Sequence, residues 1–66
     1  MKTISLNGTT RDTSSETITD LVNELALAPQ TLLIEHNGTA LHRSEWPDTA
    51  LRDGDRVEML RVAAGG

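Results

Sequence analysis

The chain has 66 residues, no cysteine and a formal net charge of −4 at pH 7. This length allows one domain with a thin core, because a domain near this size hides only about 60% of the surface of its unfolded chain, and no disulfide can reinforce it. Ten acidic against six basic side chains, with Trp46 as the one aromatic residue, argue against nucleic acid as a partner.

The first predicted elements are two strands joined by a tight turn. Ile4 and Leu6 alternate with polar residues, which is the pattern of a half-buried strand. Asn7-Gly8 is a strong signal for a two-residue hairpin, because both central positions of a type I′ turn need positive φ. The returning strand, residues 9–13, is polar throughout and suits the edge of a sheet.

One amphipathic helix follows. Thr17 is a candidate N-cap, with Asp20 three residues later to complete a capping-box-like pair. The apolar stripe is formed by Ile18, Leu21, Val22 and Leu25. We place Thr19, Asp20, Asn23 and Glu24 on the side that faces water, and we expect Pro29 to end the helix.

A second hairpin is predicted after the helix. Residues 31–36 are the most apolar strand candidate, and Asn37-Gly38 is a second two-residue turn. In such a hairpin Ile34 lies opposite Leu41, and directly opposed residues share a face of the sheet. We therefore place Ile34 and Leu41 on the core side and Leu33 on the outer side.

The rest of the chain completes the predicted sheet. Residues 44–47 read as an irregular or short helical crossing, residues 53–55 as a turn, and residues 56–62 as the final strand. The element order is ββαβββ. It predicts an α+β fold of the β-grasp type, in which a mixed sheet of about five strands wraps one helix, as a single domain over residues 1–66.

The sequence offers no catalytic residues of its own. It contains no glycine-rich phosphate loop and no thiol. Side chains alternate between the two faces along the second hairpin, which places His36 and His42 on opposite faces, so they are not expected to share a metal. Asp53-Gly54-Asp55 lacks the remaining ligands of a calcium loop. We interpret Trp46 as a lid on the small core.

Two features could carry function. The outer face of the last strand bears Leu60 and Val62, which with Leu33 predict a modest exposed apolar patch for docking. The alternative is that loops cover these residues. The second feature is residues 63–66, Ala63-Ala64-Gly65-Gly66, where side-chain size falls to nothing. We expect a flexible tail that reaches roughly 13 Å and presents the terminal carboxylate inside another protein.

Along its whole length the chain resembles the ThiS family, the sulfur carriers of thiamine biosynthesis. The most specific parts of this resemblance are Asn37-Gly38, Arg43-Ser44-Glu45-Trp46, the stretch from Asp53 to Glu58, and Gly65-Gly66. The resemblance implies a ubiquitin-like β-grasp fold. Two residues depart from the pattern: His42 stands where many relatives have proline, and His36 where many have an apolar residue. Neither departure touches the tail.

The resemblance also implies a mechanism. A ThiF-like adenylyltransferase would activate the Gly66 carboxylate with ATP and magnesium, which belong to the partner, and this chain would bind no cofactor or metal. Sulfur from a donor such as a cysteine desulfurase would give a thiocarboxylate, and a ThiG-like thiazole synthase would receive it. Gly65, Ala63 and Ala64 would enter the partner with Gly66. The chain would be a protein co-substrate rather than an enzyme.

Alternatives remain at this point. A MoaD-like carrier for molybdopterin synthesis, or a carrier for another sulfur pathway, would use the same tail, although the short chain and residues 44–46 favour the thiazole pathway. In a different class, a β-grasp binding module would have an inert terminus. The chain shows no signal peptide and no apolar run near the ~20 residues of a spanning helix. We expect a cytoplasmic protein that is monomeric when free.

Overall fold

The computed structural model describes residues 1–62. The strands are β1 (Lys2–Leu6), β2 (Thr9–Thr13), β3 (Leu32–His36), β4 (Thr39–Leu41) and β5 (Arg56–Arg61). One α-helix, α1 (Ile18–Glu24), and two 3₁₀ helices, η1 (Pro29–Thr31) and η2 (Arg43–Asp48), complete this part of the chain. The element order confirms the predicted ββαβββ arrangement, and η2 is the short helical crossing expected around Trp46.

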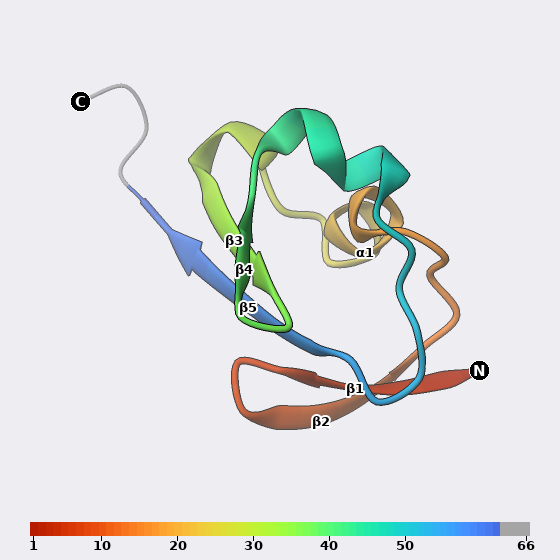
Figure 1. Cartoon of the computed structure of the whole chain (residues 1–66). Coiled ribbons are helices and arrows are strands. Elements are labelled where there is room, and N and C mark those ends of the chain that lie inside the picture. Colours follow the sequence, from red (N-terminus) through yellow and green to blue (C-terminus); the bar gives the residue numbers. More distant parts are fainter. Residues whose placement is uncertain (63–66) are drawn as a thin grey trace.

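The strands form one mixed sheet of five strands in the order β2-β1-β5-β3-β4 (Figure 1). Both hairpins are antiparallel, and β5 lies between them, parallel to β1 and antiparallel to β3. The polar strand β2 lies at an edge, as its sequence predicts. Helix α1 covers one face of the sheet (Figure 1). This arrangement is the β-grasp fold.

Both Asn-Gly pairs form the predicted turns. Asn7 and Asn37 each have φ of 51°, and Gly8 and Gly38 have φ of 81° and 86°. Positive φ at both central positions defines the type I′ turn, which follows the natural twist of paired strands. The turns fix the register, so that Ile34 lies opposite Leu41 as expected.

The N-terminus of α1 has the predicted capping box. The Asp20 N–H donates to Thr17 Oγ1 at 3.1 Å, and the Thr17 N–H donates to Asp20 Oδ2 at 3.2 Å. Two backbone donors that the first helical turn leaves unpaired are thereby satisfied. Ile18, Leu21 and Val22 are buried on the face toward the sheet.

The predicted end of the helix is wrong. Helix α1 ends at Glu24, well before Pro29, which instead begins η1. The stop is a left-handed residue, Ala26, with φ of 56°. Its N–H donates to Asn23 O at 3.0 Å and that of Leu27 to Val22 O at 3.2 Å, a Schellman motif that usually uses glycine. Hydrogen bonds at the C-terminal end of α1, and not Pro29, end this helix.

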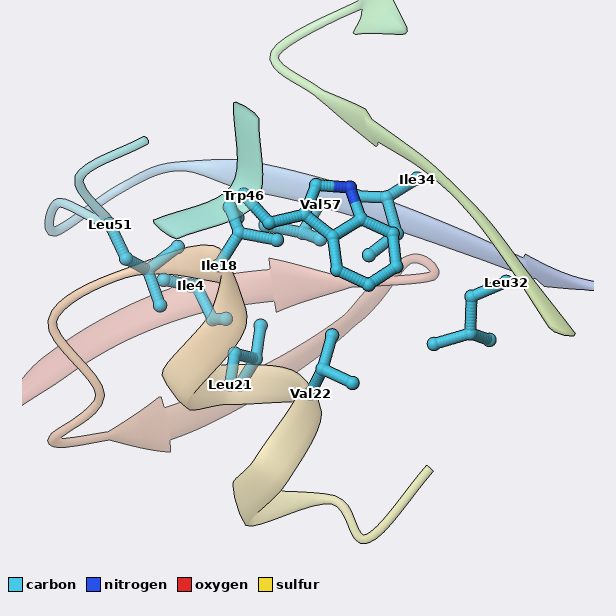
Figure 2. Packing of buried hydrophobic residues seen from close by; sticks show 9 residues of the cluster. All are labelled: Ile4, Ile18, Leu21, Val22, Leu32, Ile34, Trp46, Leu51 and Val57. Carbon is cyan, nitrogen blue, oxygen red and sulfur yellow. The ribbon is translucent and has the colours of Figure 1, made fainter. Parts of the chain in front are cut away.

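The core consists of nine buried hydrophobic residues gathered between the helix and the sheet (Figure 2). They are Ile4, Ile18, Leu21, Val22, Leu32, Ile34, Trp46, Leu51 and Val57. Trp46 is only 3% exposed, which confirms its predicted role as a lid. Its indole Nε1 has no hydrogen-bond acceptor within residues 1–62. All nine of these residues lie at or before Val57, the second residue of β5.

Glu24 lies on the exposed side of α1, as the helical pattern predicts, and it also ties α1 to the end of β2. Its carboxylate accepts hydrogen bonds from Thr13 Oγ1 at 2.5 Å, Ser15 Oγ at 2.6 Å and Arg11 Nη2 at 2.9 Å. Thr13 and Ser15 are themselves buried. The hydrogen bonds from Ser15, Thr13 and Arg11 lower the pKa of Glu24 to about 2, against a smaller opposing effect of burial.

Replacing Glu24 by glutamine should destabilise the fold in a pH-dependent manner. A carboxylate whose folded pKa lies below its unfolded pKa of about 4.3 stabilises the fold fully above about pH 5, and this contribution is lost as pH falls toward 2. Solvent screens the partly exposed group, so we expect a loss of about 1 kcal/mol at pH 7. Urea unfolding at pH 7 and pH 3 measures it. A difference between the variant and the parent that is the same at both pH values would contradict the role of the charge.

Candidate functional site

The outer face of the sheet carries the predicted apolar pair. Leu33 on β3 and Leu60 on β5 lie directly opposite each other in the register. Leu33 is 58% exposed and Leu60 62% exposed, so no loop within residues 1–62 covers them. Val62, the third predicted member, is half-buried. Exposure of the leucine pair agrees with the sequence analysis, whereas a docking role for these residues stays a prediction.

A shallow groove runs beside this pair. Its lining residues come from β3, β4, β5 and the first hairpin turn: Asn7, Leu33, Ile34, Glu35, Ala40, Leu41, Glu58, Met59 and Leu60. Next to the leucine pair, Glu35 and Glu58 are both exposed and face each other across the strands. Like charges in directly opposed positions destabilise a sheet. The outer face therefore combines an apolar pair with two exposed carboxylates, of which Glu58 also lies 3.9 Å from Arg56 Nε.

The chain leaves the sheet at the end of β5, beside η1. The Val62 N–H donates to Thr31 O at 2.7 Å, which continues the β3–β5 pairing beyond the strand. Ala63, Ala64, Gly65 and Gly66, the predicted tail with its sulfur-carrying carboxylate, lie outside the described residues. The structure thus places the origin of this segment next to the exposed leucine pair.

The second hairpin carries a hydrogen bond from a histidine to a carboxylate that no local sequence pattern predicted. His36 Nε2 donates to Asp55 Oδ2 at 2.7 Å, and Asp55 also accepts from the Arg52 N–H at 2.9 Å and Asn37 Nδ2 at 3.1 Å. Burial raises the pKa of Asp55, but the hydrogen bonds from His36, Arg52 and Asn37 together outweigh it and hold that pKa below its usual value. Through Asp55, His36 is linked to the turn at residues 52–55.

The remaining candidates have structural roles. His42 is exposed and precedes η2, where its N–H donates to Glu45 Oε1 at 2.8 Å. Gly54 forms the predicted turn with φ of 86°. Within residues 1–62 no three side chains of the metal-ligating types come together. In the same part of the chain, no helix is long and apolar enough to span a membrane.

The β-grasp fold and the exposed leucine pair agree with the class of small carrier proteins that the sequence predicts. Comparison with known sequences narrows the class, because the sequence model of the ThiS family matches residues 4–66. This chain belongs to the ThiS family, the sulfur carriers of thiamine biosynthesis, which are carrier proteins and not catalysts. The fold, family and carrier class predicted from the sequence are confirmed.

Individual relatives agree. The chain is 33% identical over 61 residues to the sulfur carrier protein ThiS of Thermus thermophilus, covering 92% of this chain and 95% of that protein. It is 31% identical to the thiamine biosynthesis protein ThiS of Geobacter metallireducens, whose crystal structure superposes with a TM-score of 0.81 over 97% of this chain and 99% of that one. The solution structure from the same organism gives 0.77 at 31% identity, over 97% and 87%.

Proposed function

We propose that the carboxylate of Gly66 is the working group of this chain, and that it carries sulfur for thiazole formation in thiamine biosynthesis. The observation that carries this proposal is the family match, which extends through the Gly65-Gly66 terminus to residue 66. The fold supports it, because residues 1–62 form a core of nine buried hydrophobic residues.

The chemistry begins with activation. A free carboxylate is a poor acyl donor, so the Gly66 oxygen attacks the α-phosphorus of ATP and pyrophosphate leaves, which gives an acyl-adenylate. The terminal sulfur of a persulfide then attacks the acyl carbon and AMP leaves as a good leaving group. A thiol reduces the resulting acyl disulfide and releases the Gly66 thiocarboxylate. ATP and magnesium are held by the activating enzyme, and this chain contributes the carboxylate.

The partners follow from these steps. A ThiF-like adenylyltransferase activates Gly66, a cysteine desulfurase supplies the persulfide sulfur, and a ThiG-like thiazole synthase consumes the thiocarboxylate. All three reactions belong to the cytoplasm. None requires a nucleic acid, a membrane or a cofactor bound to this chain.

Docking would use the outer face of the sheet. Leu33 and Leu60 supply exposed apolar area, and Val62 leads from them to Ala63, Ala64 and Gly65, which would enter the partner in extended form. A partner that places a basic side chain over Glu35 and Glu58 would complement the negative charge of these two exposed carboxylates. We therefore expect a partner surface with an apolar centre and a basic rim.

Intact mass measurement tests the proposal. After incubation with a ThiF-like enzyme, ATP and a persulfide donor, the mass should rise by the exchange of one oxygen for one sulfur, and fragmentation should place the sulfur on Gly66. A reaction without ATP is the control, because an unactivated carboxylate should not exchange. Unchanged mass with an enzyme that is active on its own carrier would overturn the proposed function.

A further inference from the structure

Strand β5 is held differently along its two edges. Toward β3 it is paired from Val57 to Arg61. Toward β1 the register covers only Ser5–Arg56 and Leu6–Val57, because β1 ends at Leu6 and the chain turns away. The part of β5 beyond Val57 thus extends past the end of β1.

The side chain of Asn7 takes the place of the missing strand. The Asn7 N–H donates to Val57 O at 2.9 Å, which continues the β1–β5 pairing into the turn. Further along, Asn7 Oδ1 accepts the Met59 N–H at 2.7 Å, and Nδ2 donates to Met59 O at 3.2 Å. A primary amide carries a donor and an acceptor side by side, as a peptide group does. Asn7 therefore satisfies both polar groups of Met59 as a strand residue would.

The second hairpin provides an internal comparison. Asn37 occupies the equivalent turn position with the same φ of 51°. Its Oδ1 accepts the Arg56 N–H at 2.8 Å, and its Nδ2 donates to Asp55 Oδ1 at 3.1 Å. Asn37 thus holds the start of β5, whereas Asn7 holds the half of the strand that leads to Val62.

We propose that Asn7 is a positioning residue for acyl activation at Gly66, an inference that rests on the function proposed above. Leu60, half of the exposed leucine pair, directly follows Met59 in β5. By hydrogen bonding to the N–H and the C=O of Met59, Asn7 fixes the backbone of β5 between the leucine pair and Val62. When a partner binds the leucine pair, the residues after Val62 then start from a fixed position relative to that partner. Small misplacement of reacting atoms slows chemistry even when binding is intact.

The test uses two substitutions of Asn7 and one matched control. Asn7→Gly permits the positive φ of the turn but removes both bonds to Met59. Asn7→Asp also suits a type I′ turn and keeps the acceptor, but it places a carboxylate oxygen against Met59 O. Asn37→Gly makes the same change in the other hairpin and leaves the Asn7–Met59 contact in place.

The first measurement is amide hydrogen exchange of the free full-length protein by NMR. Asn7→Gly should raise the exchange rate of the Met59 amide about tenfold relative to both the parent and Asn37→Gly. An unchanged rate would overturn the inference that Asn7 holds this part of β5. This result does not depend on any activating enzyme.

The second measurement is the steady-state kinetics of adenylation by a ThiF-like enzyme. Asn7→Gly should lower kcat about tenfold while KM stays within about twofold of the parent value. Asn7→Asp should also lower kcat. Asn37→Gly should leave kcat within about twofold, although it also removes hydrogen bonds from a turn. Equal losses of kcat in the two glycine variants, or a change in KM alone, would overturn positioning by Asn7. A parent protein that is not adenylated at all would instead overturn the proposed function.

Discussion

Removal of Gly66 should abolish thiocarboxylate formation while the domain stays folded. The shortened chain still ends in a glycine carboxylate, but that carboxylate lies about 3.5 Å short of the position that the activating enzyme fits. A misplacement of about 1 Å can already cost on the order of 100-fold in rate, so a whole residue should reduce sulfur transfer at least 1,000-fold. Intact mass measurement after the activation reaction quantifies the remaining product.

The matched control for this deletion is Gly66→Ala. It keeps the length of the chain and adds a methyl group. It therefore distinguishes the effect of chain length from a requirement for a last residue without a side chain. Thermal unfolding should show the same Tm for both variants and the parent, because the buried hydrophobic core within residues 1–62 lies between Ile4 and Val57. If the shortened chain still supports thiazole formation, the terminus is inert and the domain is a binding module.

Replacing Leu60 by glutamate should weaken binding to the activating enzyme about 10- to 100-fold. The substitution removes half of the exposed leucine pair and adds a third carboxylate beside Glu35 and Glu58. Because Leu60 is 62% exposed, its loss leaves no cavity, and the free energy of unfolding should change by less than about 1 kcal/mol. Isothermal titration with the partner and urea unfolding of the free variant measure the two effects.

The control for Leu60→Glu is the same new charge on a strand far from the proposed contact. Thr10→Glu serves, because Thr10 is exposed on the edge strand β2. Its affinity for the partner should stay within about twofold of the parent, since an added rim charge mainly alters the association rate. Equal affinities of the Leu60 and Thr10 variants would show that the outer face of the sheet is not the docking surface.

The features that the sequence predicted correctly are those set by neighbouring residues. Each Asn-Gly pair specifies a turn because few residue types tolerate positive φ at both central positions. The Thr17–Asp20 capping box spans a single helical turn. Once the turns are fixed, alternation along the strands decides which side faces the core, so the exposure of Leu33 and Leu60 followed from the pattern.

What the sequence did not predict depends on contacts between distant residues or on backbone strain. The Met59 peptide lies 52 positions from Asn7, and no local pattern connects them. Asp55 and His36 meet only once β5 has entered the sheet. The helix was expected to end at Pro29 because proline is a visible stop, whereas Ala26 in a left-handed conformation gives no signal in the sequence. Residues 63–66 lie outside this comparison.

The central position of β5 has a consequence for how the carrier is made. The two hairpins do not pair with each other, and β5 alone joins them into one sheet. Among the strands within residues 1–62 it is also the last in chain order, so a growing polypeptide cannot close the sheet before residues 56–61 have been translated. An incomplete chain should therefore remain open to proteases and chaperones. Folding of this sheet therefore waits for the synthesis of residues 56–61.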